Sequence, residues 1–162
     1  MTSLALDAIS SAAQRLDTFM SQIRDIEAFA VSAFGDLLGE HGFSAAQVAR
    51  DDAMTRIDFV KDDLAVEIEL DWRDFMAFVL LVHLTDGRLP SGYYVAAGQK
   101  CRKHLGNVIQ EQGWKALPGP RFDCGRPKPR NAADLKEILL GFKVQLASCM
   151  RELNAVGASV FS

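Results

Sequence analysis

The feature that most constrains this sequence is a long helical pattern at its N-terminal end. Residues 3–38 contain no proline and one glycine, Gly35. Apolar residues recur in this stretch at alternating spacings of three and four, which places them along one side of an α-helix. They are Ile9, Ala12, Leu16, Phe19, Ile23, Ile26, Ala30, Ala33 and Leu37. The spacing predicts a helix with Ser3 as candidate N-cap and Gly39 or Gly42 as its stop.

The length of this helix is itself informative. About 36 residues of α-helix span about 54 Å, whereas a compact domain of this size has a radius of gyration of only about 15 Å. A straight helix would therefore extend beyond its own globule. Either the helix breaks near residues 17–21, where Ser21 can cap a second helix, or its free end packs against another chain. The second alternative predicts a homodimer through the N-terminal helix.

Residues 54–84 read as an antiparallel meander of three or more strands. With Asp62 and Asp63 as a two-residue turn, apolar and charged side chains sort onto opposite faces of the first hairpin. The expected pairs are Phe59 with Val66, Ile57 with Ile68, and Thr55 with Leu70. A second turn at residues 71–74 pairs Leu70 with Phe75. The third strand, residues 75–84, is apolar on both faces except at its end, which is typical of a central strand.

The rest of the chain completes an α+β pattern. We expect a short helix at about residues 99–112, a loop rich in proline and glycine at 117–130, and a C-terminal helix at about 131–156 that Asn131 caps. We find no internal repeat, so residues 1–162 are expected to form a single α+β domain.

The composition excludes several classes of protein. A hydrophobic content of 49% and a charged content of 24% are typical of a globular domain. The longest apolar run is about half the length of a membrane-spanning helix, and the first residues lack the pattern of a secretory signal. We therefore expect a cytoplasmic protein with no membrane contact. Three cysteines without a CxxC pair indicate reduced thiols.

The net charge of −3 hides a strong segregation along the chain. Residues 51–74 hold nine acidic and three basic side chains, and residues 88–130 hold nine basic and two acidic ones. The two regions either neutralise each other in the fold or face partners of opposite charge.

Signatures of phosphate loops, dinucleotide folds, zinc proteases and nucleophile elbows are absent from the sequence, so we assign no catalytic residue, metal site or cofactor. Two alternatives stay open. Asp58, Glu67 and Glu69 share a sheet face and resemble the beginning of a metal-dependent hydrolase or nuclease site, although the expected lysine is missing. The basic region is a candidate for binding nucleic acid or another anion. Its residues are Lys100, Arg102, Lys103, Arg121, Arg126 and Arg130.

The order of elements also carries a resemblance. A long helix that ends in GEHGF (residues 39–43) precedes the hairpins RIDFVKDDLAVEIELDWRDFMAFVLLVHL (residues 56–84) and the closing helices. This architecture resembles small cytoplasmic bacterial proteins of the toxin-immunity type, and its helix followed by three strands is similar to acidic secretion chaperones. The first resemblance implies a non-enzymatic binder of a basic protein such as a nuclease toxin, and it transfers no functional residue.

The leading hypothesis is therefore a protein-binding module that uses an acidic and apolar sheet face, where charge steers the partner and aromatic side chains anchor it. Its expected partner-binding residues are Glu67, Glu69, Asp71, Trp72, Asp74 and Phe78.

Overall fold

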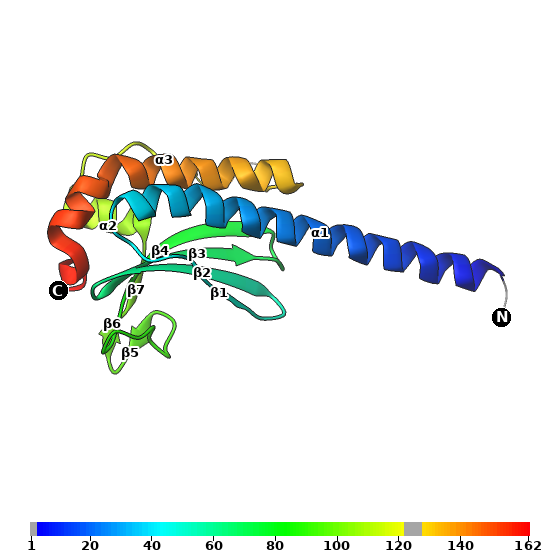
Figure 1. Ribbon diagram of the computed structural model, residues 1–162, viewed down its shortest axis with the longest axis horizontal. Helices are drawn as coiled ribbons and strands as arrows, with labels where there is room; N and C mark the ends of the chain where they lie inside the picture. The colour runs from blue at the N-terminus through cyan, green and yellow to red at the C-terminus, as the bar shows by residue number, and fades with distance from the viewer. Residues whose placement is uncertain (1–2, 122–127) are drawn as a thin grey trace.

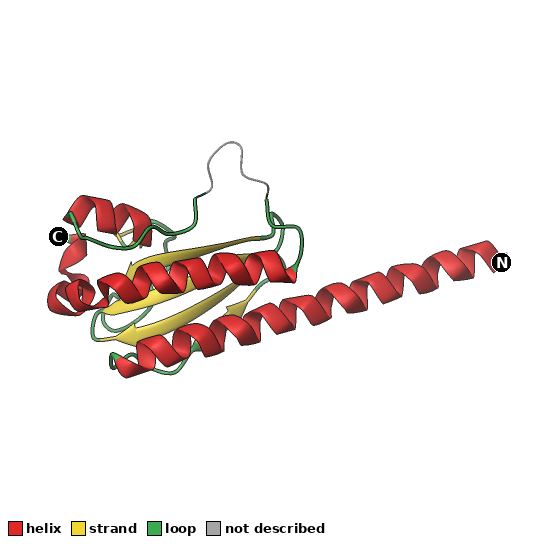
Figure 2. Cartoon of the chain, turned by 90° about the horizontal axis from the view of Figure 1, so that it is seen from above, coloured by secondary structure: helices red, strands yellow, loops and turns green. Residues whose placement is uncertain are grey.

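A twisted antiparallel sheet carries two long helices on one face, and one of these helices projects far beyond the sheet (Figures 1 and 2). The computed structural model describes residues 3–121 and 128–162. Its helices are α1 (Ser3–Glu40), α2 (Leu105–Gln112) and α3 (Ala132–Val156), followed by the 3-10 turn η1 (Gly157–Phe161). Its strands are β1 (Gln47–Arg50), β2 (Met54–Lys61), β3 (Leu64–Asp71), β4 (Met76–His83), β5 (Val95–Ala96), β6 (Gln99–Lys100) and β7 (Arg102–His104). The expected α+β class is confirmed.

The five-stranded sheet has the order β1-β2-β3-β4-β7, and β5 and β6 form a separate two-stranded hairpin. The register expected for the first hairpin is confirmed, because Phe59 pairs with Val66 and Ile57 with Ile68 around the turn at 62–63. The central position expected for the third strand is confirmed as well, since β4 pairs with β3 on one side and with β7 on the other.

The register of the second hairpin differs from the expected one by two residues. Leu70 pairs with Ala77 rather than with Phe75, and the turn occupies residues 72–75. The Asp71 carboxylate causes this longer turn, because its Oδ1 accepts hydrogen bonds from the backbone N–H groups of Arg73 (2.9 Å) and Asp74 (3.1 Å). A shift of two residues keeps every side chain on its expected face.

The helix expected at about 99–112 begins only at Leu105. Residues 99–100 pair with β5 in the separate hairpin. Residues 102–104 form β7, because the outer edge of β4 offers unpaired backbone groups that β7 satisfies, with Val82 opposite Arg102 and Leu80 opposite His104. The C-terminal helix has the expected start, since the side chain of Asn131 accepts a hydrogen bond from the N–H of Asp134.

The main hydrophobic core lies between the sheet and the two long helices. From α1 it receives Ile26, Ala30, Phe34 and Leu38, and from α3 Leu135, Leu139, Phe142, Leu146, Met150 and Leu153, all of them buried. The apolar seam of α1 therefore enters the core only from Ile26 onward. Of the two alternatives for this helix, the break near residues 17–21 does not occur, because α1 runs without interruption over 38 residues, or about 57 Å. Within the described ranges, no helix has both the length and the apolar character needed to span a membrane.

Two neighbouring leucines of α3 test this packing. Leu139 is fully buried, whereas Leu140 is 45% exposed. We expect Leu139→Ala to lower the free energy of unfolding by about 2–5 kcal/mol, because it leaves a cavity in the core, and Leu140→Ala to lower it by less than about 1 kcal/mol. Urea unfolding followed by circular dichroism measures both, and equal losses would contradict the core described above.

Candidate functional site

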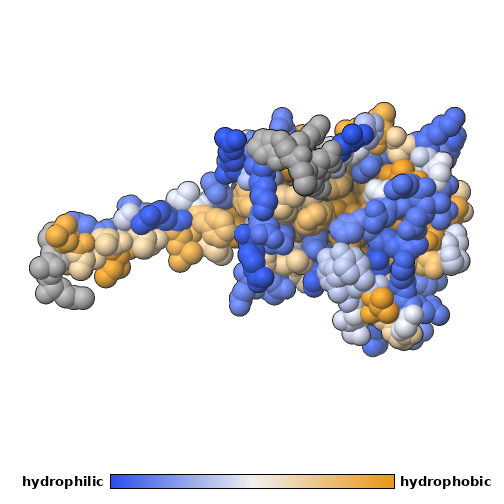
Figure 3. Space-filling view, turned by 180° about the vertical axis from the view of Figure 1, so that it is seen from behind, coloured by the Kyte–Doolittle hydropathy of each residue, from blue (hydrophilic) through white to orange (hydrophobic). Residues whose placement is uncertain are grey.

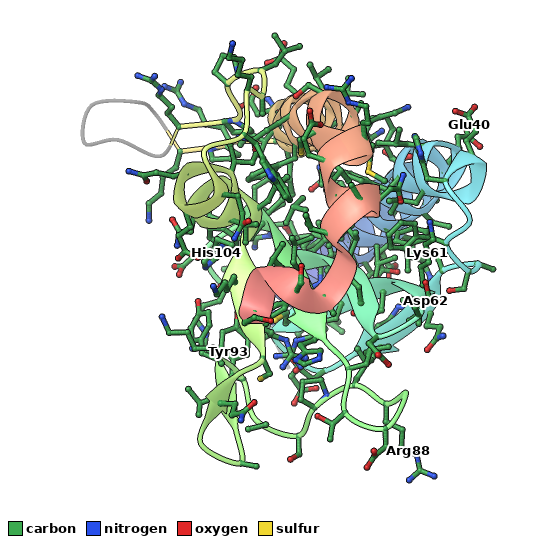
Figure 4. The ribbon with its side chains drawn as sticks, turned by 90° about the vertical axis from the view of Figure 1, so that its left-hand side faces the viewer. Glu40, Lys61, Asp62, Arg88, Tyr93 and His104 are labelled. Atoms are coloured by element: carbon green, nitrogen blue, oxygen red, sulfur yellow. The ribbon has the colours of Figure 1, made fainter. Side chains whose placement is uncertain are left out.

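The acidic side chains of β2 and β3 lie on the face of the sheet that turns away from α1 and α3. We expected this face to be an exposed partner surface, but Glu67 is 0% exposed and Glu69 is 3% exposed. The chain between β4 and β7, residues 84–101, supplies the groups that pair with them. Figure 4 shows Tyr93 of this segment on the side of the sheet opposite the long helices.

Glu67 forms a buried ion pair with Arg102 of β7. The Arg102 Nε donates to one carboxylate oxygen at 3.0 Å and Nη2 donates to the other at 3.2 Å. The Arg102 Nη1 also donates to the backbone carbonyls of Gly92 (2.6 Å) and Tyr93 (2.9 Å). One guanidinium thus joins the sheet to the segment that covers it.

Glu69 accepts hydrogen bonds from the Tyr93 hydroxyl at 2.7 and 2.8 Å, and the Arg56 Nε lies 3.8 Å from the same carboxylate. The Tyr93 ring also lies near both guanidiniums, with centroid distances of 5.6 Å to Arg56 and 5.5 Å to Arg102. Burial raises the pKa of the Glu69 carboxyl, and burial together with this carboxylate raises the pKa of Tyr93. The result is a network in which each charged group on this face faces an opposite charge.

Asp58 lies directly across the hairpin from Glu67, and its Oδ1 has no hydrogen-bond partner among the described residues. Burial, followed by the charge of Glu67, raises the pKa of Asp58 to about 8. Asp58 is therefore protonated at neutral pH. With Asp58 neutral, the two carboxylates Glu67 and Glu69 balance the two guanidiniums of Arg56 and Arg102.

The six residues expected to bind a partner do not form one exposed surface. Glu67 and Glu69 are buried, and Phe78 is half-buried with its ring edge-on to His104 at 5.6 Å. The other three lie together in or beside the β3–β4 turn. There Asp74 is exposed, Asp71 is half-buried, and the half-buried Trp72 donates from its indole Nε1 to the Thr55 hydroxyl at 2.9 Å.

The basic residues expected in the alternative of anion binding also lie in different environments. Arg102 is buried in the network, and Lys103 donates to the Glu111 carboxylate at 2.7 Å and to the Val160 carbonyl at 3.0 Å. Lys100 is exposed on β6, on one side of the sheet, whereas Arg121 and Arg130 are exposed in the segments beside α3, on the other (Figure 1). Arg126 lies outside the described residues. The structure does not bring the described members together in one patch.

The alternative of a metal-dependent hydrolase receives no support from this geometry. In residues 3–121 and 128–162, no group of three or more His, Cys, Asp or Glu side chains is arranged to hold a metal ion. Asp58, Glu67 and Glu69 are close in register, but the Arg102 guanidinium and the Tyr93 hydroxyl occupy the positions in which a cation would have to approach the two glutamates.

A small pocket lies beside the β2–β3 turn. Its volume is about 210 Å³, and Phe43, Lys61 and Asn154 are among the residues that line it. The Lys61 ammonium donates to the His41 carbonyl at 2.8 Å and to Asn154 Oδ1 at 3.1 Å (Figure 4 labels Lys61). These bonds tie the end of α1 to α3, so the cation already has a structural role.

An exposed apolar stripe runs along the first half of α1. We call residues 4–22 the overhang, because they extend past the end of the sheet (Figure 1). Figure 3 shows hydrophobic residues, in orange, along this projecting part. The exposed fractions of its large apolar side chains are 81% for Leu4, 58% for Leu6, 58% for Ile9, 60% for Leu16, 39% for Phe19 and 43% for Met20. The overhang has only three charged side chains, Asp7, Arg15 and Asp17.

The base of the overhang is fixed to the sheet by Glu27, a buried carboxylate on α1. It accepts bonds from Arg50 Nε at 2.9 and 3.0 Å and from the Thr55 hydroxyl at 2.6 Å. A second anchor joins Asp25 to Lys136 of α3 at 2.6 Å. Because these contacts hold α1 from both sides, they set the direction in which the overhang leaves the body.

Two acidic turns lie at the same end of the sheet, beneath the base of the overhang (Figure 1). One is the β1–β2 turn with Asp51 and Asp52, and the other is the β3–β4 turn with Asp71 and Asp74. The two turns contain one basic side chain, Arg73. We call these four aspartates the acidic tips.

Glu27, Tyr93 and Arg102 organise this structure. From the sequence we predicted no role for Glu27 or Tyr93, and we predicted anion binding rather than an internal ion pair for Arg102. Glu27 carried a usable signal, since it falls inside the apolar seam between Ile26 and Ala30. Tyr93 carried no signal, because it lies in an irregular segment far from Glu69 along the chain.

Comparisons with protein-family models, with curated proteins and with solved structures return no match.

Asp58 predicts a particular dependence of stability on pH. Its pKa is about 8 in the folded chain against an ordinary value of 3.8, so between about pH 4 and 8 the folded state retains a proton that the unfolded state has lost. The stability that this carboxyl contributes is therefore fully present below about pH 4, declines as the pH rises, and is lost above about pH 8. We expect Asp58→Asn, which resembles the protonated acid, to gain stability relative to the wild type between pH 5 and 8. Urea unfolding across that range measures this gain.

The exposed Asp52 provides the control for this measurement. Asp52→Asn should follow the wild-type pH profile throughout. An Asp58→Asn profile parallel to the wild-type one would show that Asp58 is ionised in the folded state at neutral pH.

The bond between Tyr93 and Glu69 predicts the cost of removing one hydroxyl group. Tyr93→Phe leaves the buried Glu69 carboxylate without its closest donor, so we expect the free energy of unfolding to fall by about 1–3 kcal/mol and trypsin to cleave faster after Arg88 and Lys100. Tyr94→Phe removes a hydroxyl whose bond to His104 Nε2, at 3.0 Å, is exposed to water rather than buried, and it should change both readouts less. Equal cleavage rates for the two variants would refute the role of Tyr93 in holding this segment.

Proposed function

We propose that this chain is a protein-binding module and that the overhang of α1 is its main contact surface. The observation that carries the proposal is the apolar stripe of the overhang, where Leu6, Ile9 and Leu16 lie on one side of the helix and are each more than half exposed. Contiguous apolar surface of this kind marks sites of association in water-soluble domains.

The stripe continues the pattern that forms the core. The alternating spacing of three and four that places Ile26 and Ala30 against the sheet extends back without a break to Ile9. No described residue of this chain covers the stripe along most of the overhang. A single helix of about this length is only marginally stable in water without tertiary contacts, so a covering partner would stabilise it.

The acidic tips supply a second element. Asp51, Asp52 and Asp74 are exposed near the base of the overhang, where they can attract a basic group on the partner. Of the six residues expected to bind a partner, Asp71, Trp72 and Asp74 remain part of this proposal. Glu67 and Glu69 do not, because the network of Tyr93 and Arg102 covers them.

An immunity-type inhibitor of a basic toxin, in the cytoplasm of a bacterium, is a narrower form of the same proposal. In this form the toxin would contact the acidic tips rather than the sheet face, because the carboxylates of that face are buried in ion pairs and hydrogen bonds. No observation favours the hydrolase or the nucleic-acid alternative above this one.

Site-specific photo-crosslinking tests the proposal. A benzophenone amino acid replaces Leu16 on the apolar stripe or, as control, Gln14 on the polar side of the same turn, and cells that express the chain are irradiated. We expect a crosslink to protein from position 16 and little from position 14. Equal yields from the two positions, or no protein crosslink at either, would rule out the overhang as a protein-binding surface.

A further inference from the structure

We propose that the partner of the overhang is the overhang of a second copy of this chain, in an antiparallel pair about a two-fold axis beside Ala12 and Ala13. This inference rests on the proposed function, because it uses the same surface and names its occupant. Isologous two-fold pairing requires a surface that is complementary to itself, and a straight apolar stripe along one helix meets that requirement.

The distribution of large and small residues favours one antiparallel register. With the axis beside Ala12 and Ala13, the two small residues lie where the helices cross, and large side chains meet on either side. In this register Ile9 faces Leu16 of the second copy, Leu6 faces Phe19, and Ala5 faces Met20. A parallel pair would instead place Ala5 against Ala5 and Ala12 against Ala12, which leaves poorly filled layers.

One flank of the stripe distinguishes the two orientations further. Leu6, Ala13 and Met20 repeat there at intervals of seven, whereas the other flank has Ala8, Arg15 and Gln22. Equivalent flanks face each other in an antiparallel pair, so the apolar flank is covered by its own copy. In a parallel pair, Met20 would instead lie against Arg15.

The length of the overhang fits this register. Opposite positions add up to 25, so Ser3, where α1 begins, lies across from Gln22, where the body begins. The two helices therefore overlap along the whole overhang, about 28 Å, with one body at each end. No part of the stripe is left uncovered, and the bodies do not need to interpenetrate.

Charge complementarity appears at both ends of the pair. The stripe is continuous with the seam that faces the sheet and α3, so the second helix lies on the body side of α1 and its N-terminus points at the acidic tips. The first turn of α1 has no acidic side chain, so the positive end of its helix dipole is free to interact with Asp51, Asp52 and Asp74 of the other copy. Along the overhang the net charge is only −1, which causes little repulsion.

The area sets the expected strength of the pair. The five large side chains of the stripe and its apolar flank, Leu6, Ile9, Leu16, Phe19 and Met20, are 39–60% exposed, and covering them in both copies buries roughly 400–800 Å² of apolar surface. The alanines and the contacts with the acidic tips bring the total near the roughly 1,200 Å² at the lower end of stable interfaces. We therefore expect a dimer with a dissociation constant on the order of micromolar.

Sedimentation equilibrium of the purified full chain between about 1 and 200 µM tests the pairing. We expect the mass to rise from 17.8 kDa to twice that value across this range. Leu16→Asp should remain a monomer with an unchanged circular dichroism spectrum of the body, whereas Gln14→Asp, on the polar side, should dimerise like the wild type. A wild type that stays monomeric throughout, or a Leu16→Asp chain that still dimerises, would overturn the inference.

Spin labels test the orientation. Labels are attached at Gln14→Cys or, separately, at Ser21→Cys, in a chain with Cys124→Ser; Cys101 and Cys149 are buried. In the antiparallel register the two labels at 14 are offset by about 5 Å along the helix, and the two at 21 by about 26 Å. Double electron–electron resonance should therefore give a much longer distance at 21. Equal distances at the two positions would indicate a parallel pair and overturn the register.

The outcomes also separate this inference from the function on which it rests. A monomeric purified chain whose position 16 crosslinks to a different protein in cells would refute the second copy as occupant and leave the binding function standing. A crosslinked product of twice the chain mass would support both. A monomer that forms no crosslink in cells would refute both.

Discussion

The packing of residues 26–38 of α1 against the sheet is the constraint on which the rest of this structure depends. Ile26, Ala30 and Phe34 contribute side chains to the main core, and Glu27 between them is held by Arg50 and Thr55 of the neighbouring strands. Because these contacts fix the axis of α1, the first half of the helix can only continue into solvent. The same seam thus builds the core at one end and presents an apolar surface at the other. Binding through the overhang is the function that follows most directly from this arrangement.

The outer face of the sheet obeys a different constraint. Three carboxylates on two neighbouring strands would repel one another if buried alone. The segment that precedes β7 solves this by supplying Arg102 to Glu67 and the Tyr93 hydroxyl to Glu69, while Asp58 keeps its proton. The charge pattern suggested that this face binds a partner, but in the structure it is an internal contact between the sheet and residues 84–101. The acidic groups that stay exposed are those of the turns, where short connections leave aspartate side chains in water.

The sequence predicted the elements well wherever a local pattern determines them. The periodicity of α1, the turn at Asp62 and Asp63 and the cap at Asn131 are each encoded by a few neighbouring residues, and each is confirmed. The second hairpin shows the limit of this approach, because the Asp71 carboxylate lengthens the turn through bonds to backbone N–H groups that hydrophobic alternation does not register. The strand at 102–104 shows another limit, since its pairing with β4 outweighs the helical stripe that begins nearby.

The candidate site, like the fold, could be predicted from the sequence only in part. The sequence by itself determined that an apolar stripe about 54 Å long could not fit within one compact domain, because helix rise and domain size are both fixed by length. Only the tertiary structure decided that α1 stays unbroken and that Glu67 and Glu69 are covered rather than displayed. Both outcomes depend on contacts between segments far apart in the chain, such as Arg102 with Glu67 and Lys136 with Asp25. Periodicity along one segment cannot encode which distant charge will meet another, so burial of the acidic face became visible only in three dimensions.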